Sequence, residues 1–146
     1  MYEDALARVD IFSSLPKKDL KDLATYCGER TFSPGSVMLT QGEQGLGLFI
    51  ITKGTASITR KNSPDGPEEV LGTAGPGNII GEMALLDDLP RSATVTAIDE
   101  VTVLLLPLWE FRRILRRIFR SDPDVGLNML AVLSRRLRMA EQRIYE

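Results

Sequence analysis

The sequence predicts a mainly β protein, a small barrel or jelly roll with helices at both ends. Between residues 29 and 106, short stretches rich in β-branched residues alternate with Gly or Pro every eight to twelve residues. On either side of this region the apolar residues recur at helical spacing. The 146 residues suffice for one domain. We therefore expect N-terminal helices over 1–28, a β-roll over 29–106 and C-terminal helices over 107–146.

The N-terminal segment has the spacing of two short helices. Residues 3–9 form an amphipathic turn, and a second helix follows Pro16, which suits a first helical turn, and ends near Gly28. The single cysteine, Cys27, lies among apolar neighbours and has no partner for an internal disulfide. This favours a packing role in a reducing compartment, and a reactive thiol is the alternative.

Five segments between residues 29 and 106 carry the strongest strand pattern: 36–40, 47–52, 55–60, 92–98 and 101–106. ITKGTASIT predicts a hairpin with Gly54 at its tip, and NSPDGPEE predicts a polar loop at the end of another hairpin. The glycines at 42, 45, 47, 54, 72, 75, 77 and 81 are interpreted as backbone devices for tight corners. None of them forms a GxGxxG or Walker loop, so a nucleoside triphosphate site is not predicted.

The composition excludes several classes of protein. No apolar run approaches the ~20 residues of a membrane span, and the N-terminus lacks the pattern of a secretory signal, so we expect a cytoplasmic protein. The chain has no histidine, which removes His-based catalytic triads and zinc sites. We therefore expect no enzyme activity, no metal and no cofactor.

The segment after Pro107 predicts a helix with Phe111, Ile114, Leu115 and Ile118 on its apolar side. Basic residues gather toward this end: residues 110–146 carry 9 basic and 5 acidic side chains, against 9 and 15 in residues 1–109. Such a segment suits either an acidic partner or a solvated helix face.

A second, longer helix is expected from Pro123, with Asp122 as its N-cap. Its apolar residues form a seam of the coiled-coil kind beside a second stripe. Two stripes predict that one docks on the protein itself and that the seam faces a partner helix in a homodimer. A single broad stripe that only packs on the roll is the alternative. The seam consists of Leu130, Leu133, Leu137, Ala140 and Ile144, and the second stripe of Met129, Val132 and Met139.

Residues 81–95, GEMALLDDLPRSATV, combine a carboxylate and a guanidinium around a short helical run. The free amides at the start of such a run favour an anion, and Arg91, returned by the Pro90 turn, adds a charge-assisted contact. Glu82 can accept hydrogen bonds from hydroxyl groups nearby. The pattern predicts a ligand with one phosphate beside a free hydroxyl. Alternatively, Glu82 is only a favourable first-turn acid, and Arg91 pairs with Asp87 or Asp88.

The same segment resembles the phosphate-binding cassette of the cyclic nucleotide-binding domain family, whose pattern G-E-[LIM]-A-L-L-x-x-x-P-R-[AST]-A-[TS]-V it matches without a gap. FSPGSVMLTQGEQGLGLFIITKGTASI is similar to the early strands of that family, and the likeness covers nearly the whole chain. The resemblance implies an eight-stranded β-roll, a short cassette helix and a long C-terminal helix. It also implies a regulatory sensor for a cyclic nucleoside monophosphate, similar to the sensor domain of catabolite activator-like bacterial regulators.

The resemblance assigns roles within the cassette. Glu82 would hold the ribose 2′-hydroxyl, Arg91 the exocyclic oxygen of the cyclic phosphate, and the N–H groups of Ala84 and Ser92 would complete the cradle, while Gly81 permits close approach. The implied ligand-binding residues are Gly81, Glu82, Met83, Ala84, Arg91, Ser92 and Ala93.

Two departures from the family limit this transfer. The Thr and Ser that meet the adenine base in the bacterial regulators look like Ala140 and Glu141 here. Arg138, by stacking, or Glu141, by accepting a hydrogen bond, is the expected base contact. We expect cAMP rather than cGMP, although Ser92 could reach a guanine amino group.

The second departure is that no helix-turn-helix domain follows the long helix within the 146 residues. We therefore expect no DNA-binding domain and no direct nucleic-acid contact. The alternatives are the excised sensor half of a transcription regulator, or a degenerate roll that serves as a ligand-free dimerisation or docking domain.

Overall fold

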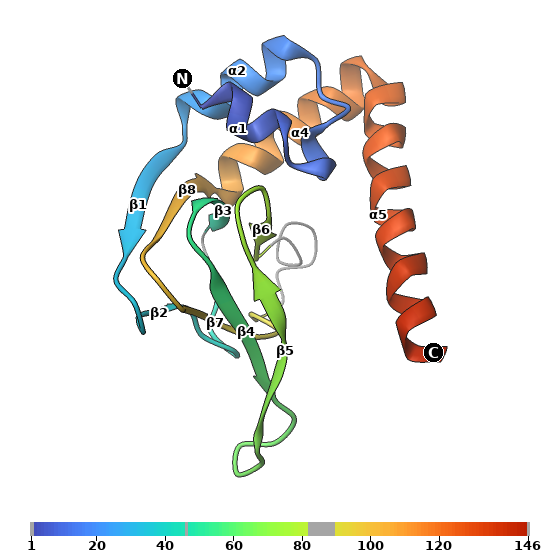
Figure 1. The fold of residues 1–146 in the computed structure, drawn as a ribbon. Helices are drawn as coiled ribbons and strands as arrows, with labels where there is room; N and C mark the ends of the chain where they lie inside the picture. The colour runs from blue at the N-terminus through green and yellow to red at the C-terminus, as the bar shows by residue number, and fades with distance from the viewer. Residues whose placement is uncertain (1, 46, 82–89, 146) are drawn as a thin grey trace.

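The computed structural model describes residues 2–45, 47–81 and 90–145. Figure 1 shows a β-roll with short N-terminal helices above it and a long C-terminal helix beside it. The helices are α1 (Glu3–Ala7), the 3₁₀ helix η1 (Asp10–Phe12), α2 (Lys17–Thr25), α4 (Leu108–Ser121) and α5 (Pro123–Tyr145). The strands are β1 (Gly28–Phe32), β2 (Val37–Leu39), β3 (Gly47–Lys53), β4 (Ala56–Lys61), β5 (Glu68–Ala74), β6 (Ile79–Ile80), β7 (Thr94–Ala97) and β8 (Val101–Pro107).

The eight strands of the described residues form two antiparallel sheets, ordered β1-β8-β3-β6 and β2-β7-β4-β5. This confirms the expected β-roll. The run LFII of β3 is buried on both faces because it separates two apolar clusters. Phe49 and Ile51 face the interior of the roll, whereas Leu48 and Ile50 pack under the helices.

The hairpin expected at Gly54 is wrong. β3 pairs with β8 and β6, while β4 lies in the other sheet and pairs with β5 and β7. Gly54 therefore marks the corner at which the chain leaves one sheet for the other. Its φ of +89° and the carbonyl oxygen of Glu100, 2.2 Å from where a Cβ would lie, restrict this corner to glycine.

The second hairpin prediction is confirmed, since the NSPDGPEE segment contains the turn between β4 and β5. Three strands lie outside the segments singled out from the sequence: β1, β5 and β6. β1 and β5 are mostly exposed, so they lack a buried alternating pattern, and β6 has only two residues.

The N-terminal helices cover one end of the roll, and Phe12 packs against Phe111 of α4 with ring centroids 5.2 Å apart. α2 starts directly after Pro16, as expected, but Gly28 opens β1 instead of ending the helix. The Cys27 thiol donates to the carbonyl oxygen of Leu23 at 3.5 Å. Burial raises the pKa of this thiol to about 11, which favours the packing role.

The C-terminal helices follow the predicted faces in part. α4 buries Phe111, Ile114, Leu115 and Ile118, and α5 begins at Pro123, as predicted. Met129 and Val132 of α5 are buried. In the described part of the chain no helix combines the length and the apolarity of a membrane-crossing segment.

The predicted seam of α5 divides between two environments. Leu133 is half-buried against the protein's own core, so its assignment to a free partner-facing seam needs correction. Leu130 and Leu137 are 47% and 64% exposed, and Ala140 is exposed as well. The side chain of Ile144 lies outside the described residues. Met139, expected beside the buried residues of the second stripe, is exposed.

Candidate nucleotide-binding site

The two described ends of the predicted cassette meet at Arg91. This side chain is only 8% exposed, and its Nη1 donates to the carbonyl oxygen of Gly81 at 3.1 Å. Its Nη2 donates to the carbonyl oxygen of Gly47 at 2.6 Å. Between these ends lie Glu82, Met83 and Ala84 together with Asp87 and Asp88, all outside the described residues.

The loop between β2 and β3 holds the main chain of Arg91. The N–H of Arg91 donates to the carbonyl oxygen of Glu43 at 2.8 Å, and the N–H of Gly42 donates to the carbonyl oxygen of Arg91 at 2.9 Å. The loop thus fixes the main chain of Arg91, while Gly47 at the start of β3 and Gly81 fix its guanidinium. Such preorganisation lowers the conformational entropy that a ligand must restrict on binding.

Two glycines enclose the guanidinium. A Cβ on Gly45 would lie 1.9 Å from Cζ of Arg91, and a Cβ on Gly81 would lie 2.3 Å from its Nη1. Gly45 has no positive φ, so close approach, and not a tight corner, explains this glycine. Only the tertiary contact with Arg91 identifies Gly45 as part of the site, and the sequence carries no separate signal for it.

A cavity of about 130 Å³ lies beside the guanidinium. Its walls are mainly apolar, and its cation is buried, so an anion that enters meets a strong and weakly screened charge. The predicted residues Gly81, Arg91, Ser92 and Ala93 all border it. The rest of the lining is Leu39, Ile58, Ile79, Ile80, Pro90 and Val95.

A second cavity, of about 550 Å³, continues toward α5 and shares Ile58 and Ile79 with the first. Thr73 and Ala74 of β5 line one side. The side facing them belongs to α5 and consists of Arg136, Met139 and Ala140. The second cavity is more polar than the first, because Arg8, Asp10 and Asn78 also line it.

Arg136 also ties α5 to the N-terminal helices, because its Nε donates to Oδ2 of Asp10 at 3.1 Å and its Nη2 bonds Oδ1 of the same carboxylate. The predicted base contact Arg138 is exposed and does not border the cavity, and the side chain of Glu141 lies outside the described residues. The sequence interpretation missed Arg136, although it shares a helix face with Val132 and Met139 at i, i+4 and i+7.

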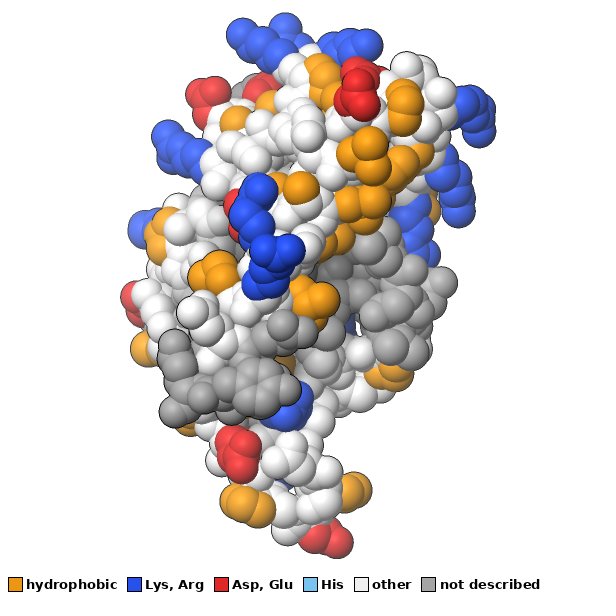
Figure 2. Space-filling model, turned by 90° about the vertical axis from the view of Figure 1, so that its right-hand side faces the viewer, with side chains coloured by type: hydrophobic (Ala, Val, Ile, Leu, Met, Phe, Trp, Pro, Cys, Tyr) orange, Lys and Arg blue, Asp and Glu red, His pale blue; other side chains and the backbone are white. Residues whose placement is uncertain are grey.

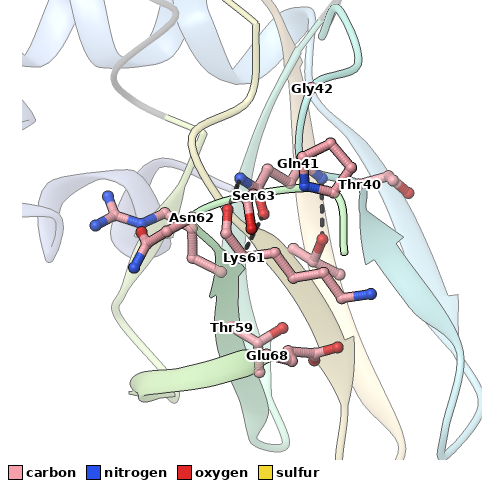
Figure 3. A pocket seen from close by; sticks show the side chains of 11 residues that line it. Thr40, Gln41, Gly42, Thr59, Lys61, Asn62, Ser63 and Glu68 are labelled. Carbon is pink, nitrogen blue, oxygen red and sulfur yellow. Dashed lines mark hydrogen bonds between the residues drawn. The ribbon is translucent and has the colours of Figure 1, made fainter. Parts of the chain in front are cut away.

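A third hollow, of about 500 Å³, lies beside the turn of the β4–β5 hairpin (Figure 3). The Gln41 side chain bonds the main chain of Lys61 twice: its Nε2 donates to the carbonyl oxygen at 2.8 Å, and its Oε1 accepts from the N–H at 2.9 Å. The Gln41 N–H donates to Oγ1 of Thr94 at 3.0 Å. Gln41 therefore anchors the Arg91-holding loop to the hairpin.

Comparison with known proteins identifies the family. The profile of the cyclic nucleotide-binding domain matches residues 29–118, which is most of the chain. The chain belongs to this family. Arg91 and both cavities, as far as the described residues define them, are thus features of a cyclic nucleotide-binding domain.

Relatives of this cyclic nucleotide-binding domain include kinase subunits and transcription regulators. It is 36% identical over 115 residues to a cAMP-dependent protein kinase regulatory subunit of Yarrowia lipolytica, covering 79% of this chain and 30% of the relative. It is 31% identical over 142 residues to a CRP-like cAMP-activated global transcriptional regulator of Mycobacterium tuberculosis, covering 97% of this chain and 61% of the relative. The chain thus spans less than two thirds of either relative.

A solved structure shares the fold over most of this chain. The co-crystal structure of the regulatory domain of Toxoplasma gondii PKA with cAMP superposes with a TM-score of 0.79 at 25% identity, covering 95% of this chain and 49% of that one. The family consists of regulatory nucleotide binders, which fits a buried cation flanked by apolar walls.

Proposed function

We propose that this domain binds cAMP in preference to cGMP and reports its occupancy through α5. The observation that carries the proposal is the Arg91 guanidinium, buried between Gly45 and Gly81 and bordering an otherwise mainly apolar cavity. The relatives described as cAMP-dependent or cAMP-activated support the choice of ligand. No catalytic step is part of this proposal.

In the proposed complex the cyclic phosphate lies at Arg91 and the main chain of Ser92 and Ala93. Gly81 leaves room for the ligand, as the family resemblance implies. Glu82 would accept from the ribose 2′-hydroxyl, with Met83 and Ala84 completing the cassette. A guanidinium paired with a phosphate in a site of low exposure forms a charge-assisted contact stronger than a neutral hydrogen bond.

The base would extend into the second cavity toward α5. There Met139 offers a polarizable contact for a purine ring, and Arg136 a planar cation that stacks on it. This placement replaces Arg138 with Arg136 as the preferred stacking residue. Glu141 stays a predicted acceptor for the base.

Isothermal titration calorimetry of the chain with cAMP, cGMP and 5′-AMP tests the proposal. At about 0.3–0.5 kcal/mol per ligand heavy atom, cAMP is expected to bind with a Kd in the micromolar range or below. We expect cGMP to bind at least about fivefold more weakly, and 5′-AMP more weakly still. Equal affinity for cAMP and cGMP would contradict the preference, and absence of binding by either would contradict the function.

Two arginines of α5 form a matched pair for the base contact in the same titration. Arg136→Ala is expected to weaken cAMP binding about tenfold, whereas Arg138→Ala, at an exposed position outside the cavity, should change it less than about twofold. The reverse order would restore Arg138 as the base contact.

We further propose that α5 transmits the signal. One face of this helix borders the cavity through Arg136, Met139 and Ala140, and the same helix is tied to η1 by the Asp10 ion pair. A base that engages Arg136 competes with Asp10 for the guanidinium. Occupancy thereby biases the position of α5 relative to the N-terminal helices. Hydrogen exchange over residues 123–145 should then differ with and without cAMP.

The exposed stripe of α5 supports a homodimer. Figure 2 shows hydrophobic side chains gathered on the upper part of the face that α5 presents. Leu127 is exposed together with Leu130 and Leu137, and the three share one side of the helix. A contiguous apolar stripe of this kind on a helix is typical of a helix–helix interface.

Light scattering on a size-exclusion column tests the dimer. The wild-type chain is expected to elute with twice the monomer mass, and the double variant Leu130→Lys with Leu137→Lys with the monomer mass, because paired lysines in a seam repel. Leu71→Lys is the control, since it makes the same change at an exposed position of β5, outside the α5 stripe. A wild-type chain that elutes as a monomer at high concentration would contradict the interface.

A further inference from the structure

A cavity of about 520 Å³ opens between the two sheets near β1 and β2. These strands lie on the side of the roll opposite α5 (Figure 1). We call this cavity the β1–β2 slot. It is distinct from the two cavities of the proposed nucleotide site, and among the described residues it shares Arg91 and Leu39 with the cavity beside the cassette.

About half of the residues that line the slot are apolar. Met38 and Phe49 are buried and Leu105 is half-buried, and all three border it. At its outer end stand Val37 and Trp109, both exposed, and Trp109 is 61% exposed although it is a large aromatic side chain. A cavity bordered by both exposed and buried hydrophobic residues suits the apolar part of a molecule that enters from solvent.

The slot is also charged. Arg91, buried within the roll, borders it, and Arg30 adds a second cation, while Glu43 contributes one carboxylate. The described residues of the lining thus carry two arginines and one glutamate. A cation buried in a mainly apolar cavity attracts an anion, because little water screens the interaction.

We propose that the β1–β2 slot binds a small amphipathic monocarboxylate, such as a medium-chain fatty acid or an aromatic acid. The carboxylate lies toward Arg91, the apolar body lies along Phe49 and Leu105, and the outer end is covered by Trp109. A neutral molecule would lack the electrostatic attraction to Arg91, and Arg91 would repel a cation. The observed combination of apolar walls and a buried cation therefore selects an anionic amphiphile.

The placement also predicts coupling between the two sites. Because Arg91 borders both the slot and the cavity beside the cassette, a carboxylate and a cyclic phosphate would both interact with the same guanidinium. Each ligand is then expected to lower the affinity for the other by the same factor. This coupling rests on the proposed nucleotide function, whereas binding of the carboxylate itself does not.

Fluorescence titration with octanoate and octan-1-ol tests the slot, since Trp109 is the single tryptophan of the chain and borders it. Octanoate is expected to shift the emission to the blue in a saturable manner, with a Kd at least about tenfold below that of octan-1-ol. Equal affinity of the two molecules, or no saturable change with octanoate, would overturn the proposal.

Three variants locate the site. Leu105→Phe narrows the slot and should weaken octanoate binding about tenfold, while Leu71→Phe makes the same change on exposed β5 and should leave the affinity unchanged.

Glu43→Gln, at an exposed position, removes the carboxylate of the lining. It should lower the Kd for octanoate about threefold, and it tests the site even if Leu105→Phe fails to fold. Equal effects of the two Leu→Phe changes, or no effect of Glu43→Gln, would overturn the assignment.

A final titration separates the two proposals. Saturating octanoate should raise the Kd for cAMP at least about threefold. A cAMP affinity that octanoate leaves unchanged would overturn the placement of the carboxylate at Arg91. A chain that binds octanoate but no cyclic nucleotide would instead contradict the proposed function and leave the slot in place.

Discussion

Replacement of Arg91 by alanine is expected to weaken cyclic nucleotide binding about 30- to 1000-fold, equivalent to about 2–4 kcal/mol. The guanidinium is the one cation that borders the cassette cavity in the described part of the chain, and without it the cyclic phosphate would be desolvated against mainly apolar walls. Calorimetry on a variant whose circular dichroism and thermal unfolding match the wild type measures the loss. A loss below threefold would contradict the assignment.

Matched variants distinguish geometry from charge. Arg60→Ala removes an exposed arginine from β4 and should leave the affinity unchanged.

Gly45→Ala keeps Arg91 but places a methyl group against its guanidinium, and about tenfold weaker binding of the cyclic nucleotide is expected. Gly28→Ala is its control, because a Cβ there meets nothing within 4 Å. If Gly45→Ala bound as well as Gly28→Ala, the enclosure of the guanidinium would have no part in binding.

Replacement of Arg117 by methionine is expected to lower the free energy of unfolding by about 3 kcal/mol. Arg117 of α4 donates to Oδ1 of Asp19 at 2.5 Å and to Oδ2 of Asp22 at 3.0 Å, both on α2. The Asp19 side chain is 5% exposed, so its carboxylate would stay buried without its cation. Because Arg117 itself is half-exposed, water can reach part of the gap, which holds the cost at the lower end for a broken buried pair.

Urea unfolding measures this loss, and thermal unfolding should show a decrease in Tm of roughly 6–12 °C. Arg116→Met, one position earlier on the exposed side of α4, is the control and should change stability by less than about 0.5 kcal/mol. The double variant Asp19→Asn with Arg117→Met should recover part of the loss, because the uncompensated charge is gone. An Arg117→Met protein as stable as the control would show that the ion pair contributes nothing.

The Arg91 and Arg117 substitutions test two features that differ in how far they could be predicted from the sequence. Arg91 stands in a local pattern of 15 residues whose chemistry is visible without a fold, so its role could be proposed directly. The pair of Arg117 with Asp19 joins helices that are far apart along the chain. No spacing rule connects two such positions, and only the packing of α4 on α2 reveals the pair.

The same contrast holds for the incorrect predictions. The ITKGTASIT segment has the local features of a hairpin, but β3 pairs with β6 and β8, which lie far from it along the chain. On α5, helical spacing placed Leu133 in the partner-facing seam, whereas the core beneath the helix covers it in part. Periodicity defines the angle between two side chains on one helix, but not which angle faces the protein interior.

The sequence by itself determined the mainly β class, the flanking helices and the buried side of α4, and it carried the pattern around Arg91, because each is encoded in neighbouring residues or in a regular repeat. Only the tertiary structure decided the partners of the strands, the packing of Gly45 on the guanidinium, the Arg136 side of the second cavity and the β1–β2 slot. These features depend on contacts between segments distant in the chain, and such contacts are set by how the two sheets and the helices share one core.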